Sequence, residues 1–238
     1  MFIQVDVQEE RSADISLIDK FEAKIKDKAF PCVGAKSALA RQRMQFLTVG
    51  DIRCPLDDKA IHDALRDFAQ SYAAAPGPFQ SFVVIFDTTG DLSEDAFERA
   101  LWHRIQALEK IDAQSGHAYD RRVSPNVEDS NFSLSFAGEA FFVVGLHPNA
   151  SRPARRFDMP AMVFNAHDQF EMLRAEGRYD TLRESIIQRD TALAGSPNPM
   201  LARFGETSEA SQYSGRLVPE GWKCPFQRVH REPGNADS

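Results

Sequence analysis

The sequence is poor in residues that would cross-link the chain, bind zinc through cysteine or insert it into a membrane. Only three of its 238 residues are cysteine and none forms a Cys-x-x-Cys pair, which argues against a disulfide framework and a cysteine zinc site. The longest apolar run, 137–146, is interrupted by Gly138 and Glu139 and stays far below the roughly 20 residues of a membrane helix. We therefore expect no membrane partner.

Basic residues are also in deficit. Lys and Arg number 28 against 35 Asp and Glu, so the formal net charge is −7 at pH 7 and nucleic acid is not an expected partner. The first residues, MFIQVDVQEERSADIS, contain acids where an export signal needs a basic start and an apolar centre, so we expect a cytoplasmic protein. A hydrophobic content of 42% and a charged content of 26% are typical of a folded globular domain.

Periodicity predicts one α+β domain over residues 1–229, followed by a polar, disordered tail at 230–238. The expected strands are 44–49, 81–86, 131–137, 140–146 and 161–165, with Gly138-Glu139 as the turn of a hairpin. The expected helices are 15–28 capped by Ser12, 57–74, 93–111 capped by Ser93, 167–176 and 179–190. Four or five strands and about five helices without strict alternation favour a mixed or mostly antiparallel sheet.

The segment GLHPNASRPARRF, 145–157, carries the strongest chemical signal. His147 follows an apolar strand and precedes a proline, a position from which an imidazole can ligate a metal or a haem iron. A histidine that only hydrogen-bonds a carbonyl is the alternative. Arg152, Arg155 and Arg156 carry forked donors that suit carboxylates or phosphates, such as haem propionates, and a solvated basic turn is their alternative.

A second segment, FNAHDQFEMLR at 164–174, offers a different metal set. His167 and Glu171 are four residues apart on an expected helix and could join His147 as the two-histidine, one-carboxylate ligands of a non-haem iron. Alternatively, Asn165 caps this helix and Asp168 favours its positive end, which would explain the polar residues without a metal.

Other candidates carry weaker signals. Cys32 could supply a thiolate ligand, although a buried, unreactive thiol is the simpler interpretation. His103 and His117 are expected to be surface or core residues. The stretch 205–216 lacks the residue order of a hydrolase elbow and of a phosphate-binding loop.

Six segments taken in order resemble the YqcI/YcgG family over residues 30–226. They are PCVGAKSAL (31–39), FSLSFAGEAFFVVGLHPNASRPARRF (132–157), MVFNAHDQFEMLR (162–174), NPM (198–200), SEASQYSGR (208–216) and CPF (224–226). The resemblance implies a b-type haem and an oxygenase that uses O₂ and an external electron donor, such as a reductase. Its reaction would hydroxylate a guanidino or amine nitrogen of arginine or a related small molecule, as in the D-cycloserine and guanitoxin pathways.

The resemblance also implies roles for individual residues. His147 is expected as the axial ligand of the haem iron, and Arg152, Arg155 and Arg156 are expected beside the propionates. Glu139, Glu171 and Glu209 lie in matching segments and are the candidates for holding a cationic substrate. A non-haem iron oxygenase and a haem-binding sensor or carrier without turnover are the alternatives, and a homodimer is left open.

Overall fold

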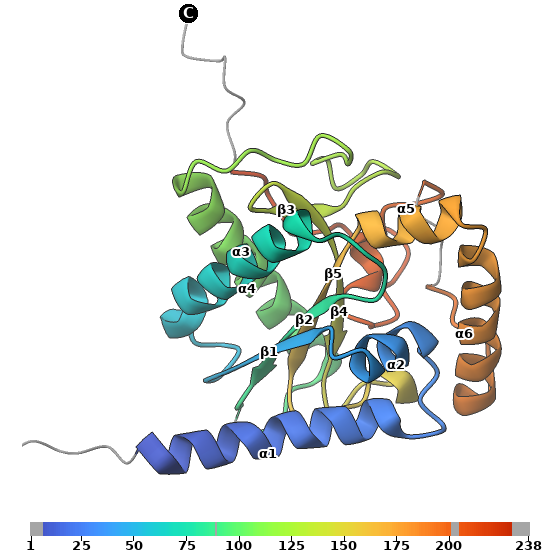
Figure 1. Ribbon diagram of the computed structural model, residues 1–238, viewed down its shortest axis with the longest axis horizontal. Coiled ribbons are helices and arrows are strands. Elements are labelled where there is room, and N and C mark those ends of the chain that lie inside the picture. The colour runs from blue at the N-terminus through green and yellow to red at the C-terminus, as the bar shows by residue number, and fades with distance from the viewer. Residues whose placement is uncertain (1–6, 89, 201–204, 230–238) are drawn as a thin grey trace, which may run out of the picture.

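The computed structural model describes residues 7–88, 90–200 and 205–229, so the expected tail at 230–238 lies outside the described residues. Within this part of the chain the strands form one sheet flanked by helices (Figure 1). Its order is β1-β2-β5-β4-β3, formed by β1 (Met44–Val49), β2 (Ser81–Phe86), β5 (Ala161–Ala166), β4 (Glu139–Leu146) and β3 (Leu134–Phe136). Strands β1 and β2 are parallel and the other pairs are antiparallel, which confirms the expected mixed α+β arrangement.

The helices follow the expected pattern with two differences. They are α1 (Val7–Lys26), α2 (Val33–Ala40), α3 (Asp58–Ala74), α4 (Glu94–Gln114), α5 (Asp168–Ala175) and α6 (Tyr179–Ala194). Helix α1 begins before Ser12, so the expected cap there is wrong, whereas Ser93 caps α4 by accepting the Ala96 N–H at 3.2 Å. Helix α2 was not expected. No helix in the described part combines the length and apolar character that crossing a bilayer requires.

Different helices cover the two faces of the sheet, with α3 and α4 on one side and α1 and α2 on the other (Figure 1). Side chains alternate along a strand, so neighbouring residues of β4 point to opposite faces. Phe141 and Val143 belong to the large core under α3 and α4, whereas Val144 and Leu146 pack with the core under α1. This alternation decides where each candidate residue lies.

The hairpin turn between β3 and β4 lies one residue earlier than expected. Phe136 pairs with Glu139, so the turn residues are Ala137 and Gly138, both with positive φ (52° and 82°). Two-residue hairpin turns favour positive φ because their twist then matches that of the strands, and glycine adopts it without a steric penalty. Glu139 is consequently the first residue of β4.

Gly145 sets the spacing between β4 and α4. A Cβ atom there would lie 2.8 Å from Phe97 Cε1 and 2.8 Å from Leu101 Cδ1. We expect Gly145→Ala to lower the free energy of unfolding by about 1–3 kcal/mol, the usual cost of overpacking a core. Urea denaturation measures the change, with Gly34→Ala as the control because the nearest atoms to its added Cβ are 3.7 Å away. Equal stability of the two variants would contradict close packing at Gly145.

Candidate functional site

A cavity of about 330 Å³ lies on the α1–α2 face of the sheet, a volume within the usual range of small-molecule and cofactor sites. Its walls are mostly apolar and come from α1, α2, the sheet, α5, α6 and the 3₁₀ helix η3 (Glu209–Gln212). A few polar side chains face this apolar space, among them His167, Arg152, Arg155 and Glu209. Such a combination suits a largely apolar ligand with a few charged groups.

The cavity brings together segments that are far apart in the chain. Five of the six segments that suggest the family resemblance contribute lining residues, represented by Cys32 (31–39), Arg155 (132–157), His167 (162–174), Asn198 (198–200) and Glu209 (208–216). The sequence alone did not show that these segments meet. Their convergence makes this cavity the candidate functional site.

His167 is the histidine that lines the cavity. It follows β5 directly and lies on the same face of the sheet as Asn165 and Val163, which also line the space. Burial and the nearby Arg174 lower the pKa of its imidazole to about 4. The ring is therefore neutral at neutral pH, which is the form that can ligate a metal or a haem iron.

His147 lies elsewhere, although it is placed at a strand end as the sequence predicts. It continues the row of Phe141, Val143 and Gly145, so its ring points to the α4 face and stacks on Phe97 with centroids 4.4 Å apart. Burial lowers the pKa of its imidazole, and Nδ1 is buried without a hydrogen-bond partner in the described chain. His147 does not line the cavity.

The three ligands expected for a non-haem iron do not meet. The His167 N–H donates to the Ala140 carbonyl at 2.8 Å, near the start of β4, whereas His147 follows the end of that strand. Seven residues of extended chain span roughly 20 Å, so one ion cannot reach both rings. Glu171 is 51% exposed and paired with Arg174. The prediction of a site formed by His147, His167 and Glu171 is therefore wrong.

The proposed helix cap at this segment is also wrong. Asn165 lies inside β5, where its side-chain oxygen accepts the Ser81 hydroxyl at 2.7 Å, and it does not cap α5. Asp168 does lie in the first turn of α5, as expected from the helix dipole.

The three arginines differ in their surroundings. Arg152 forms an ion pair with Asp190 of α6, with Nε to Oδ2 at 2.8 Å. Arg156 donates to the carbonyls of Ala150 at 2.7 Å and Ser151 at 3.0 Å and does not line the cavity. Both are thus engaged in holding the loop after β4.

Arg155 is the arginine best placed for an anion. It lines the cavity and donates to the carbonyls of Gly145 at 3.1 Å and Gln212 at 3.1 Å. Burial lowers its pKa to about 10, and no carboxylate of the described residues pairs with it. A half-buried cation without a directly paired carboxylate gains stability when an anionic group enters.

Of the three glutamates expected to hold a cationic substrate, Glu139, Glu171 and Glu209, only Glu209 lines the cavity. Burial raises its pKa to about 7, and Oε1 accepts hydrogen bonds from the hydroxyls of Tyr213 at 2.6 Å and Ser133 at 2.7 Å. Glu139 instead pairs with Arg122 at 2.7 Å, and Glu171 with Arg174. Neither of these two contributes to the cavity wall.

Cys32 lines the cavity as a protonated thiol. It precedes α2, and its Sγ accepts the Ala35 N–H at 3.4 Å. Burial raises the pKa of the thiol, which disfavours the thiolate at neutral pH.

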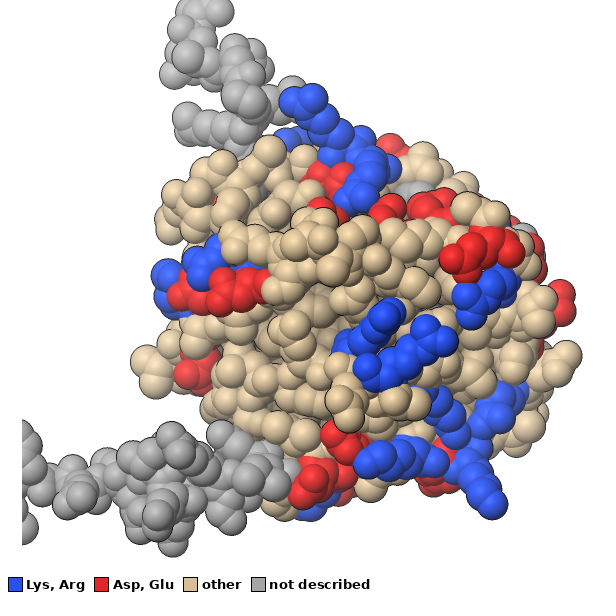
Figure 2. Space-filling view, in the orientation of Figure 1, with Lys and Arg blue, Asp and Glu red and all other residues tan. Residues whose placement is uncertain are grey.

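Charges on the molecular surface are dispersed. On the face shown in Figure 2, charged side chains lie in small groups, several of which contain both signs, with uncharged surface between the groups. No continuous basic field covers this face, which agrees with the acidic net charge of the sequence.

Sequence reasoning missed one polar cluster, made of His62, Asp112 and His117, which lies on the α3–α4 side. His117 was expected to be an ordinary surface or core residue. The sequence feature that indicated this cluster is His62, a polar residue beside Ile61 and Leu65 on the apolar face of a helix.

Comparisons with known proteins agree with the family resemblance of the six segments. The model of the YqcI/YcgG family matches residues 21–227. A curated relative, the uncharacterized protein YcgG of Bacillus subtilis (strain 168), is 24% identical over 207 residues, which cover 83% of this chain and 80% of that protein. No solved structure matches the chain.

Proposed function

The chain belongs to the YqcI/YcgG family, and on this premise we propose that it is a haem-dependent oxygenase that acts in the cavity lined by His167. The reaction we propose is hydroxylation of a guanidino or amine nitrogen of arginine or a related small molecule. One atom of O₂ enters the new N–OH bond and the other leaves as water, with electrons and protons supplied through an external donor such as a reductase.

The convergence of five resembling segments on one cavity carries this proposal. A haem site needs apolar walls, a neutral imidazole and cations for its carboxylates. The cavity offers apolar walls from α1, α2 and α6, the neutral ring of His167, and Arg155 without a carboxylate partner in the described chain. This donor chemistry fits a b-type haem.

Each polar residue of the cavity wall would have a separate role. His167 would hold the haem iron through its neutral imidazole, whereas His147, which the sequence suggested, points away from the cavity. Arg155 would donate to a haem propionate, and the apolar walls would keep water from the reacting atoms. Glu209 would accept hydrogen bonds from the cationic group of the substrate. Haem, when bound, would supply the activation of O₂.

The deciding experiment is the absorption spectrum of protein produced with haem supplied, followed by a pyridine assay for haem and by oxygen uptake. We expect a Soret band, about one haem per chain, and oxygen consumption that depends on arginine or a related amine. A protein without haem would overturn the proposal. A haem protein that consumes no oxygen with any such amine would instead be a sensor or carrier.

Substrate binding is expected to depend on pH through Glu209. Because the pKa of Glu209 is about 7, its side chain is neutral below this pH and anionic above it, while the guanidinium group stays charged. The dissociation constant of a guanidino substrate should therefore fall by about tenfold as the pH rises through 7, the size of one charge-assisted hydrogen bond. Isothermal titration across this range measures it.

Two variants test the assignment of this pH dependence. Glu209→Gln should bind weakly at every pH and lose the dependence, whereas Glu139→Gln should keep it because Glu139 lies outside the cavity wall. An unchanged pH profile in Glu209→Gln would assign the dependence to another group.

A further inference from the structure

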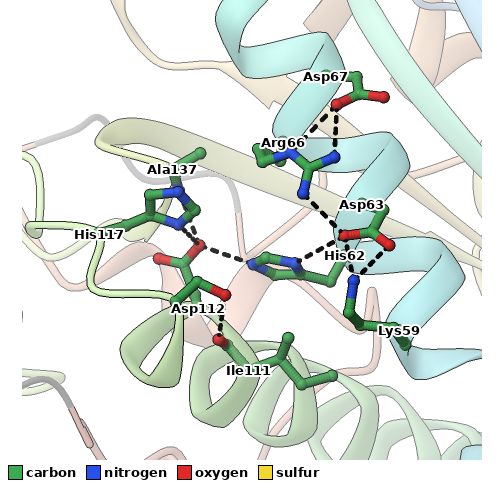
Figure 3. A network of polar contacts seen from close by, with 10 residues as sticks. Lys59, His62, Asp63, Arg66, Asp67, Ile111, Asp112, His117 and Ala137 are labelled. Atoms are coloured by element: carbon green, nitrogen blue, oxygen red, sulfur yellow. Dashed lines mark hydrogen bonds and ion pairs between the residues drawn. The ribbon is translucent and has the colours of Figure 1, made fainter.

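Three side chains from separate parts of the chain meet near the C-terminal end of α4 (Figure 3). His62 comes from α3, Asp112 from α4 and His117 from the segment that follows α4. The distances to Asp112 Oδ1 are 2.9 Å from His62 Nε2 and 2.8 Å from His117 Nδ1. One potential ligand atom from each residue lies within 4.8 Å of the other two.

The carboxylate at the centre of this cluster is in an unfavourable position. Asp112 is fully buried and lies in the last turn of α4, where the helix dipole disfavours a negative charge, and no basic residue of α4 lies in that turn. The Ala137 N–H of the hairpin turn also donates to Oδ1 at 3.0 Å. These donors compensate the buried carboxylate, and a cation bound at the same oxygen would also interact favourably with its charge.

The other nitrogen of the His62 ring gives a second, independent observation. If Nε2 carries the proton donated to Asp112, Nδ1 of the neutral ring is an acceptor, and it is buried without a hydrogen-bond partner. It lies 3.8 Å from Oδ1 of Asp63, itself an acceptor that Lys59 and Arg66 hold in place. In that tautomer, two acceptors face each other at a side chain that is only 1% exposed.

We propose that His62, Asp112 and His117 bind a divalent transition-metal ion of the zinc class, at a site separate from the cavity. The ion would take the lone pair of His62 Nε2, and the ring proton would move to Nδ1, from which it can donate to Asp63. This is the arrangement in which a ligating histidine donates its other N–H to a carboxylate, and it gives the unpartnered nitrogen a partner.

The donor set and spacing fit such an ion. Two imidazoles and one carboxylate suit zinc better than magnesium or calcium, which prefer oxygen ligands. In a tetrahedral site with metal–ligand distances of about 2.0–2.2 Å, neighbouring ligand atoms lie about 3.3–3.6 Å apart. The two histidine nitrogens, now 2.9 and 2.8 Å from Asp112 Oδ1, would therefore move away from it by only about half an ångström when the ion binds. His117 is 26% exposed, which leaves an approach from solvent and room for water as a fourth ligand.

The ion would join α3, α4 and the segment after α4 on the face of the sheet opposite the cavity. Its binding does not require haem, so failure of this proposal and failure of the proposed oxygenase are separate results.

The test uses the full chain without a histidine tag, after treatment with a chelator, titrated with zinc chloride in a calorimeter. We expect one zinc ion per chain and a higher melting temperature with zinc, since a ligand that binds the folded state stabilises it. His117→Ala should weaken zinc binding at least tenfold, whereas His103→Ala, an exposed histidine of α4, should match the unsubstituted protein. Absence of one-to-one binding, or equal binding by His117→Ala, would overturn the proposal.

A measurement on the unsubstituted protein tests the proposal independently of how well the variants fold. A long-range ¹H–¹⁵N spectrum of the imidazoles reports which nitrogen of His62 carries the proton. We expect the proton on Nδ1 after zinc is added. A proton that remains on Nε2 in the presence of saturating zinc would show that His62 is not a ligand.

Discussion

Replacement of His167 with alanine is expected to abolish haem retention, whereas His147→Ala is expected to retain haem. His167 lines the cavity and its imidazole is neutral at neutral pH, while His147 is stacked on Phe97 across the sheet. If His167 holds the iron, as proposed, the His167→Ala substitution removes the bond that fixes the haem. The measurement is haem content per chain by the pyridine assay, together with the Soret band of each variant.

Added imidazole tests whether the missing imidazole group accounts for the loss of haem in His167→Ala. A truncated side chain leaves space at the iron, so free imidazole should restore haem binding and the spectrum in His167→Ala. His103→Ala is the control for removal of a histidine outside the cavity, since His103 is exposed on α4. If His147→Ala loses haem and His167→Ala keeps it, the axial ligand is His147 and the cavity described here is not the haem site.

The face of the sheet to which His147 points could not be predicted from the sequence of β4. A strand with one polar face would show by its alternation which side chains point outward, but β4 carries apolar residues on both faces. The sequence therefore predicted that His147 stands at a strand end, which is correct, without predicting the face. A shift of one residue exchanges the faces, and tertiary packing, including the close approach of Gly145 to α4, fixes the choice.

Two of the local errors in the fold, helix α2 and the hairpin turn, arise where short-range rules gave no clear signal. Helix α2 has eight residues, includes Gly34 and Ser37, and lacks a row of large apolar residues at helical spacing. Its first turn is capped by the sulfur of Cys32, which is not one of the usual capping residues. The hairpin turn uses Ala137 at positive φ, a conformation uncommon for alanine, so the sequence placed the turn one residue later.

The sites themselves depend on contacts that local patterns do not contain. Glu209 and Ser133 are 76 residues apart, and His62 and Asp112 are 50 apart, yet each pair is hydrogen-bonded in the structure. The sequence could nominate His167, Arg155 and Glu209 as polar residues in resembling segments. Their assembly around one cavity follows only from the tertiary packing of the sheet against α1, α2 and α6.

The arginines of the loop after β4 provide the second prediction with a large expected effect, because two of them are chemically matched but face different surroundings. Arg155 and Arg156 both donate to backbone carbonyls and neither pairs with a carboxylate of the described residues. Of these two arginines, Arg155 lines the cavity and Arg156 does not. A comparison of their methionine variants therefore separates the loss of loop hydrogen bonds from the loss of an anion partner.

Arg155→Met is expected to weaken haem binding by about tenfold or more, since a charge-assisted hydrogen bond contributes about 1.5–3 kcal/mol. Arg156→Met should bind haem within about twofold of the unsubstituted protein, because the guanidinium of Arg156 donates to the carbonyls of Ala150 and Ser151 and lies outside the cavity wall. Haem titration gives the affinities, and urea denaturation of the haem-free proteins gives the stability that each variant loses. Equal losses of affinity in the two variants would show that Arg155 supports haem binding by holding the loop in place and not by binding a propionate. The hydrogen bonds to backbone carbonyls are the feature that the two arginines share.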